Sequence, residues 1–355
     1  MILLTSSSRD TGLGQYVYSL ANLPYMRDSE IYYYGRMTYE KYNKTGKNEK
    51  SYITQVAGYL DSKFRLRNYS DNIHVTSEGF GPIYGKKTRL VTIHNIFNKN
   101  FIWGFRNFKQ RSVINLTLRN FQKIAELGVY SVVPSNFVAN KFQEMYNADP
   151  SRIFVVPHYI DTRFFSKKPK DESRKKLSVS PKTFVALHVG EDDLRKNSKT
   201  IIEAWNKFSN IYPDSLLIKI GNSDVFNEYI AIHPAAKIRI YNFVEREALP
   251  LFYSASDVLF NPSVLESFSY TVLEAMSCGL VPIVSKIELY FEELGDFLIG
   301  TDAFDSDGFV QILLDFANGN SKVDSAALSN HVKAHFNERR FLVSYQNLYE
   351  EVGLL

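Results

Sequence analysis

The sequence has almost no cysteine and no long hydrophobic run. Its 355 residues include one cysteine, Cys278, so an intrachain disulfide is impossible and a cysteine-based metal site is not expected. No stretch approaches the ~18 uninterrupted apolar residues of a membrane-spanning helix. The opening run Met1–Thr5 is too short, and lacks the basic flank, for a secretory signal. We therefore expect a cytoplasmic globular protein, and a chain of this length suggests two domains.

Acidic residues are missing from one segment of the first half. Between Gly79 and Ala125 there is no Asp or Glu, although the formal net charge of the whole chain is only +4. Such a segment could face an anionic membrane surface, a phosphate-bearing partner or nucleic acid. It could equally be a solvated basic helix face whose aromatic residues lie in the core. The basic and aromatic residues that raise the question include Lys99, Trp103, Arg106 and Lys109.

Strand and helix patterns alternate along the chain in two successive runs, which predicts an α/β fold. In the first run, Ile2–Ser7 predicts a strand, and Arg89–Ile93 predicts a strand that leads into His94. The almost entirely polar stretch Ser166–Lys176 marks the expected boundary. The alternation then restarts with the expected strands Thr183–Val189 and Leu216–Ile220 and the helices Ser198–Ile211 and Tyr270–Cys278.

The most specific motif lies between Asn261 and Gly279, where Glu266 and Glu274 stand eight residues apart. We expect Glu266 in a loop after a strand and Glu274 in the following helix. The backbone N–H groups at the start of that helix would form an anion site suited to a diphosphate. Glu274 could then accept hydrogen bonds from hydroxyls such as a ribose diol, and Glu266 could meet a sugar. The alternative is that both are ordinary surface carboxylates.

This segment resembles the E-x7-E signature of glycosyltransferase family 4, a retaining family with the GT-B fold. Several other segments agree with the family in the same order, from about residue 2 to residue 285. They are the glycine loop at Thr11–Gly14, the strand and histidine at Val91–His94, the donor-phosphate lysine motif at Val189–Asn197, and the stretch Asn242–Val244 before the glutamates.

The resemblance implies a GT-B architecture of two facing Rossmann-like domains with an interdomain cleft. Residues 1–160 would form the acceptor-side domain and residues 161–335 the nucleotide-sugar-binding domain. Residues 336–355 would form a C-terminal helix that packs back on the first domain. The implied activity is that of a retaining hexosyltransferase, which moves a sugar from a UDP- or GDP-sugar to a glycan or lipid-linked acceptor. Peripheral association with the inner face of a membrane fits such an acceptor, and no nucleic acid partner is expected.

The resemblance also assigns roles to individual residues. The catalytic candidates are Glu266, His94 and Lys196. The donor-binding candidates are Gly12, Gly14, Gly190, Arg195, Lys196, Phe243, Val244, Glu266, Ser267, Phe268, Ser269, Tyr270 and Glu274. Candidates for contact with the acceptor or a membrane come instead from the acid-free segment and from the residues beside the glycine loop, and they are Arg9, Asp10, Lys99, Trp103, Arg106 and Lys109.

The expected chemistry needs no metal or cofactor. The leaving nucleoside diphosphate gains negative charge, which Lys196, Arg195 and the helix start near Tyr270 would stabilise. Metal-dependent transferases use an Asp-x-Asp cluster instead. The two look-alikes here, Asp192-Asp193 and Asp305–Asp307, are expected to be solvated loops.

Some residues depart from the family pattern and leave alternatives open. Ser267 and Ser269 stand where the family usually has glycines, and Glu191 stands where it often has arginine. The chain could therefore be a non-catalytic sugar-binding scaffold, or a GT-B-fold UDP-sugar 2-epimerase or hydrolase. Lys196 could be a surface lysine at a helix start, and His94 a satisfied histidine at a strand end.

Overall fold

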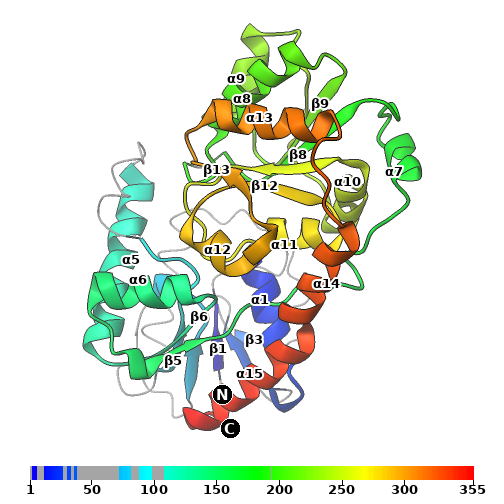
Figure 1. The fold of residues 1–355 in the computed structure, drawn as a ribbon. Coiled ribbons are helices and arrows are strands. Elements are labelled where there is room, and N and C mark those ends of the chain that lie inside the picture. The colour runs from blue at the N-terminus through cyan, green and yellow to red at the C-terminus, as the bar shows by residue number, and fades with distance from the viewer. Residues whose placement is uncertain are drawn as a thin grey trace. The chain divides into compact units, whose positions relative to one another are not determined.

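The computed structural model divides the chain into two compact units, shown together in Figure 1. The structure describes residues 2–5, 12–26, 30–32, 36–37, 72–80, 88–97, 108–192 and 194–355. The first unit comprises residues 1–158 and 341–355, and the second comprises residues 159–340. The stretch Ser166–Lys176 lies inside the second unit rather than between the units. Its residues Lys170–Lys176 form helix α7. The buried Arg174 of this helix donates a hydrogen bond to the carbonyl of Pro181, in the loop before the following strand, and so holds the helix in the second unit.

The first unit is built on a sheet with the strand order β3-β2-β1-β4-β5-β6-β7, in which every described pair is parallel except β2 with β3. The strands are β1 (Ile2–Leu4), β2 (Glu30–Tyr32), β3 (Arg36–Met37), β4 (Ile73–Val75), β5 (Thr88–Thr92), β6 (Tyr130–Val133) and β7 (Ile153–Val155). The helices are α1 (Gly12–Ala21), α5 (Phe108–Glu126) and α6 (Asn136–Tyr146). Apolar side chains of α5 and α6, among them Phe121 and Phe142, pack on strand residues such as Val91.

The last helix of the chain, α15 (Glu338–Glu351), returns to the first unit. Hydrogen bonds between buried side chains hold it there. The hydroxyl of Tyr349 lies 2.9 Å from Nδ1 of His74 on β4. The hydroxyl of Tyr345 contacts the hydroxyl of Tyr16 on α1. The C-terminal segment is therefore part of the core of this unit.

The second unit has a six-stranded sheet with the order β10-β9-β8-β11-β12-β13, in which all neighbours are parallel. Its strands are β8 (Phe184–Val189), β9 (Ser215–Ile220), β10 (Ile238–Tyr241), β11 (Val258–Asn261), β12 (Val281–Ser285) and β13 (Ile299–Thr301). Its helices are α7, α8 (Ser198–Ile211), α9 (Asp224–Ile232), α10 (Leu249–Ala255), α11 (Tyr270–Ser277), α12 (Glu288–Leu294), α13 (Ser306–Ala317) and α14 (Ser325–His335).

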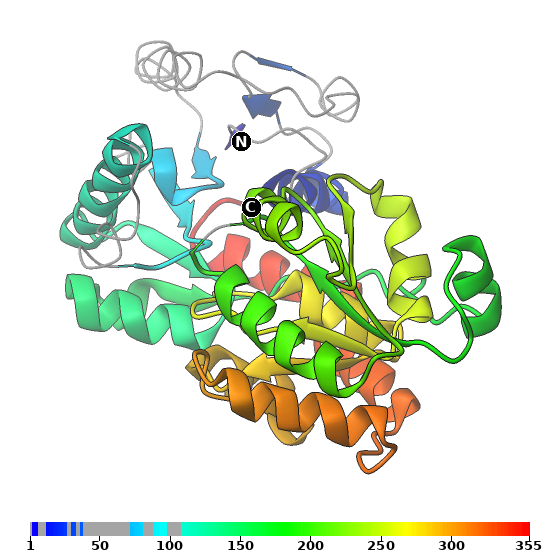
Figure 2. The same ribbon diagram turned by 90° about the horizontal axis from the view of Figure 1, so that it is seen from above.

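Helices cover both faces of this second sheet, and its strands are accordingly rich in apolar residues. Alternate residues of β8 enter different cores: Ala186 packs with α8 and α13, whereas Leu187 packs with α10, α11 and α14. Helices α8 and α13 lie side by side on one face (Figures 1 and 2). This is the doubly wound arrangement that the sequence alternation predicted.

Candidate functional site

The strand order of the second unit places the candidate site at one edge of its sheet. Strands β9 and β10 lie on one side of β8, and β11, β12 and β13 lie on the other. The chain thus reverses its winding direction between β8 and β11. In open parallel sheets, ligands bind at the carboxyl ends of the strands where this reversal occurs. The loops that leave β8 and β11 at that point carry Lys196 and Glu266.

Lys196 and Glu266 form an ion pair across this point, with 2.5 Å between Nζ and Oε1. Both side chains are largely buried, being 14% and 7% exposed. Ser263 donates a further hydrogen bond of 2.9 Å to the same carboxylate oxygen. Lys196 lies against Gly190, where an added Cβ would come within 3.3 Å of its methylene groups. Gly190 therefore gives the lysine room to reach the glutamate.

Glu274 occupies the second turn of α11 and is 4% exposed. Its Oε2 accepts a hydrogen bond of 3.0 Å from the Tyr253 hydroxyl, and its Oε1 lies 3.1 Å from Nη1 of Arg246. Burial raises the pKa of Glu274, while Arg246 opposes the rise. Arg246 itself lies over the ring of Phe165, 4.7 Å from its centroid. Sequence analysis missed Arg246, although it lies only two residues after the Asn242–Val244 stretch.

The serines that replace the family's glycines are buried in the loop before α11. Ser267 and Ser269 are 3% and 2% exposed. The hydroxyl of Ser269 lies 3.4 Å from that of Tyr290, and its backbone amide donates to Glu293 at 3.3 Å. Between the two serines, Phe268 packs on Tyr270, the first residue of α11. The serines therefore belong to a packed loop that fixes the start of the helix.

The turns that follow β8 and β9 are held together by Lys219, a completely buried lysine on β9 that sequence analysis missed. Its ammonium group contacts the carbonyl of Gly190, lies 3.2 Å from the carbonyl of Asn222, and lies 3.7 Å from Asp192. Burial lowers the pKa of Lys219, while Asp192 opposes the change. Gly221 has φ +109°, and a Cβ there would lie 2.3 Å from the Gly190 carbonyl oxygen.

The expectation that Asp192 is a solvated loop residue was wrong. Its side chain is 3% exposed, and it accepts hydrogen bonds from the Ser198 hydroxyl and the Val225 amide. Because Ser198 and Val225 lie in the first turns of α8 and α9, the carboxylate lies where helix dipoles favour a negative charge. Asp305 caps α13 through the Gly308 amide. Asp193 lies outside the described residues, and among those described no three His, Cys, Asp or Glu residues could hold a metal ion together.

The remaining donor-site candidates of the second unit flank these turns. Arg195 is half-buried, and its carbonyl accepts a hydrogen bond of 2.8 Å from the amide of Val264. That bond ties the β8 loop to the β11 loop. Phe243 is 55% exposed beyond the end of β10, and Val244 is half-buried against the core.

His94 belongs to the first unit, just beyond β5, and is 7% exposed. Its Nε2 lies 2.8 Å from the carbonyl oxygen of Thr76, so Nε2 carries the proton. Nδ1 then accepts from Nε2 of His158 at 3.4 Å. Burial lowers the pKa of His94 to about 4. The neutral ring is fixed by contacts on both nitrogens, which suits a positioning role and not that of a base.

The other candidates of the first unit are incompletely described. Gly12 and Gly14 lie in the first turn of α1. Arg9, Asp10, Lys99, Trp103 and Arg106 lie outside the described residues, and Lys109 is described only as a backbone position of α5. Among the described residues no helix is both long and apolar enough to cross a bilayer.

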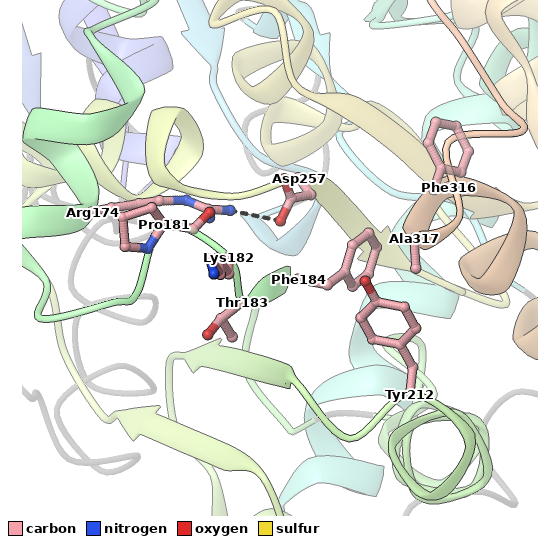
Figure 3. A pocket seen from close by; sticks show the side chains of 9 residues that line it. All are labelled: Arg174, Pro181, Lys182, Thr183, Phe184, Tyr212, Asp257, Phe316 and Ala317. Carbon is pink, nitrogen blue, oxygen red and sulfur yellow. Dashed lines mark hydrogen bonds and ion pairs between the residues drawn. The ribbon is translucent and has the colours of Figure 1, made fainter.

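A separate cavity of about 300 Å³ lies at the opposite, amino edge of the second sheet (Figure 3). Two of its charged groups, Arg174 and Asp257, already have partners. Arg174 donates to Asp257 at 2.7 Å and to the carbonyl of Pro181 at 2.7 Å. Asp257 also pairs with Lys170 and accepts from the Val185 amide. Because Arg174 and Asp257 neutralise each other, this cavity is a weaker candidate for the ligand site than the carboxyl edge.

The second unit is similar in sequence to a known protein family. Residues 169–317 match the family model "Glycosyl transferases group 1". The chain is 31% identical over 183 residues to UDP-Gal:alpha-D-GlcNAc-diphosphoundecaprenol alpha-1,3-galactosyltransferase of Escherichia coli, a match that covers 48% of this chain and 46% of that enzyme. It is 27% identical over 171 residues to alpha-monoglucosyldiacylglycerol synthase of Acholeplasma laidlawii, covering 46% and 42%. The matched region is thus under half the length of each of these two relatives.

Solved structures confirm the predicted GT-B fold. The chain superposes on the HepE protein of Anabaena in complex with UDP with a TM-score of 0.72 and 16% identity, over 100% of this chain and 99% of that one. It superposes on sucrose-phosphate synthase of Thermosynechococcus elongatus with a TM-score of 0.78 and 17% identity, over 99% of both chains. At these identities the likeness shows the fold alone.

Proposed function

We propose that this chain is a glycosyltransferase that uses a nucleotide-sugar donor, and that the second unit binds this donor at the carboxyl edge of its sheet. The Lys196–Glu266 ion pair at the point where the sheet reverses its winding carries the proposal. The family match of residues 169–317 contains both residues. The name of the E. coli relative includes a nucleotide sugar, UDP-Gal, and the Anabaena structure contains UDP.

In this proposal the diphosphate binds where the β8 loop and the first turn of α11 meet. The first amides of an α-helix have no helical acceptor, so they can bind phosphate oxygens. Lys196 would leave Glu266 and approach the diphosphate, freeing the carboxylate to meet the sugar. Glu274, at the second turn of the same helix, would exchange one of its present contacts for a ribose hydroxyl.

The proposed reaction proceeds with retention and without a metal ion. The bond between the anomeric carbon and the diphosphate oxygen breaks, and the acceptor oxygen bonds to the same face of the sugar. The acceptor proton passes to the departing diphosphate. Lys196 stabilises the charge that develops on the leaving group. His94, neutral and held on both nitrogens, would position a group of the sugar.

The test is product analysis with UDP-, GDP- and ADP-sugars, with and without a panel of glycan and lipid-linked acceptors. We expect transfer, and NMR of the product should show the anomeric configuration of the donor. Conversion of the nucleotide sugar without acceptor would instead show an epimerase. Nucleotide binding without turnover on any acceptor would favour a sugar-binding scaffold, and an inverted product would overturn retention.

We further propose a lipid-linked acceptor. The name of the E. coli relative specifies a diphosphoundecaprenol-linked sugar, and that of the A. laidlawii relative specifies a glucosylated diacylglycerol. The acid-free segment Gly79–Ala125 would then meet an anionic surface. Flotation with liposomes that contain or lack anionic lipid tests this at two salt concentrations. Binding that requires anionic lipid and weakens with salt supports it. Absence of binding even at low salt would leave a soluble acceptor.

A further inference from the structure

Glu293 is a buried carboxyl group that neither the motifs nor the proposed reaction uses. It lies in α12 and is 3% exposed. Its Oε1 accepts a hydrogen bond of 3.3 Å from the backbone amide of Ser269. Its Oε2 is buried and has no hydrogen-bond partner among the residues that the structure describes. A buried carboxylate with an unsatisfied oxygen is costly, so this site favours the neutral acid.

The charges around Glu293 also favour the neutral acid. Burial raises the pKa of Glu293 well above its usual range, and the negative charges of Glu266 and Glu292 raise it further. Tyr290 lies on the same helix, and its own pKa is raised well above the usual value, so it too is uncharged. His331 on α14 hydrogen-bonds to the backbone of Glu293 and not to its carboxyl group: Nε2 of His331 lies 2.7 Å from the backbone carbonyl oxygen.

The hydrogen bond that the Glu293 side chain accepts lies at the start of the helix that carries Glu274. Ser269 is the residue immediately before α11. Holding its amide fixes where the helix begins, and therefore where the next amides point. A negative charge at this place would repel an incoming diphosphate. A protonated carboxyl can hold the amide through its carbonyl oxygen without adding that charge.

We propose that Glu293 is a positioning residue for donor binding that works as a neutral acid, holding Ser269 at the start of α11 without adding negative charge to the anion site. This role rests on the proposed function, since it concerns the diphosphate of the donor. The structural requirement is specific: position 293 must offer a hydrogen-bond acceptor to Ser269 and must carry no charge.

The experiment compares UDP, GDP and ADP binding by calorimetry to the full chain and three variants between pH 6 and pH 9. Glu293→Gln keeps the acceptor and is permanently neutral. Glu293→Ala removes the acceptor. Glu292→Gln makes the same chemical change at the neighbouring, exposed position and serves as the matched control. The ionisation of the nucleotide phosphate itself is common to all four proteins, so the comparison between them removes it.

We expect Glu293→Gln to bind the preferred nucleotide as well as the wild type at pH 6. As Glu293 ionises at higher pH, the wild type should lose affinity relative to Glu293→Gln. Glu292→Gln should do so from a somewhat lower pH, because it removes a negative charge that raises the pKa of Glu293. Glu293→Ala should bind about tenfold more weakly than Glu293→Gln at every pH. Thermal unfolding of each variant, measured without nucleotide, shows whether the variant is still folded, so that weaker nucleotide binding can be separated from a loss of stability.

Two results would overturn the proposal for Glu293 and leave the proposed function intact. One is a Glu293→Gln variant that binds as weakly as Glu293→Ala, since the charged carboxylate would then be the working form. The other is a Glu293→Gln variant with the same pH dependence as the wild type. A wild-type protein that binds none of the three nucleotides would instead overturn the proposed function, together with the donor role of Glu293.

Discussion

Lys196 reaches over Gly190 to Glu266, so that two residues seventy positions apart place their charged groups 2.5 Å from each other. Both side chains are largely buried. A bound diphosphate would compete with Glu266 for the lysine. Donor binding and the breaking of this ion pair are therefore expected to be coupled.

The first prediction separates the contributions of Lys196 and Glu274 to the reaction. Lys196→Ala should lower kcat by about a hundredfold, because its charge is needed most as the diphosphate leaves. Glu274→Ala should chiefly weaken nucleotide binding, by roughly 1–3 kcal/mol. Steady-state kinetics and calorimetry measure the two effects. Lys199→Ala, which removes an exposed lysine of α8 three residues after Lys196, is the control and should change neither.

Lys196→Ala also leaves the buried Glu266 without its cation, so a loss of stability must be separated from a loss of catalysis. The double variant Lys196→Ala/Glu266→Gln removes both charges. It should recover stability in thermal unfolding and remain slow in turnover. Recovery of turnover along with stability would show that Lys196 has only a structural role.

The general plan of the fold could be predicted from the sequence because periodic patterns encode it. Helix α8 was predicted with its observed bounds, Ser198–Ile211, since its apolar residues recur at helical spacing. The two α/β runs likewise predicted the fold class, whereas the GT-B fold and the donor-site candidates came from the resemblance of the E-x7-E segment to a known family. Patterns of this kind depend only on neighbours along the chain.

The buried polar residues of the site could not be predicted, because their partners are distant and mostly backbone. Lys219 lies in a strand and binds carbonyls of two turns, whose meeting depends on the strand order. Arg246 and Glu293 meet α11 and the loop before it from other segments. A single charged residue in a sequence carries no sign of such contacts. Asp192 was misjudged for the same reason, as its lysine partner is on another strand.

The second prediction concerns the close contact between the β8 and β9 turns. Gly221→Ala should lower the free energy of unfolding by about 3 kcal/mol, because it combines a positive φ with a clash against the Gly190 carbonyl. Gly319 also has a positive φ, +74°, but has no neighbour within 4 Å of an added Cβ. Gly319→Ala should therefore cost only about 1 kcal/mol. Equal losses in urea unfolding would show that the turns can separate.

The third prediction is that activity survives EDTA. The charge on the leaving diphosphate would be met by Lys196 and the first amides of α11, which need no divalent ion. Initial rates should be measured before and after dialysis against EDTA, and again with added Mg²⁺ or Mn²⁺. Loss of activity with EDTA that Mn²⁺ restores would contradict the proposed mechanism.

The fourth prediction concerns pH and the packing of α15 on the first unit. His74 lies between Tyr349 at 2.9 Å and Thr92 at 2.8 Å, and burial lowers its pKa to about 3, with a smaller effect from His94. Because this pKa is below that of the unfolded chain, ~6.5, the unfolded state takes up the proton first as the pH falls. The stability that the neutral His74 contributes is therefore complete above about pH 6.5 and is lost between that pH and about pH 3.

Urea unfolding of the wild type and of His74→Gln at pH 7, 6 and 5 tests this prediction. Below pH 6.5 the wild type should lose up to about 1.4 kcal/mol per pH unit relative to the variant, which does not titrate at this position. Glu78, whose pKa burial raises to about 6, acts in the opposite direction, but it is present in both proteins and cancels in the difference. Tyr349→Phe removes a partner of His74 without removing the imidazole. Its free energy of unfolding should therefore be lower than that of the wild type but should change with pH at a similar rate. Parallel curves for the wild type and His74→Gln would mean that His74 can be protonated without loosening α15 from the sheet.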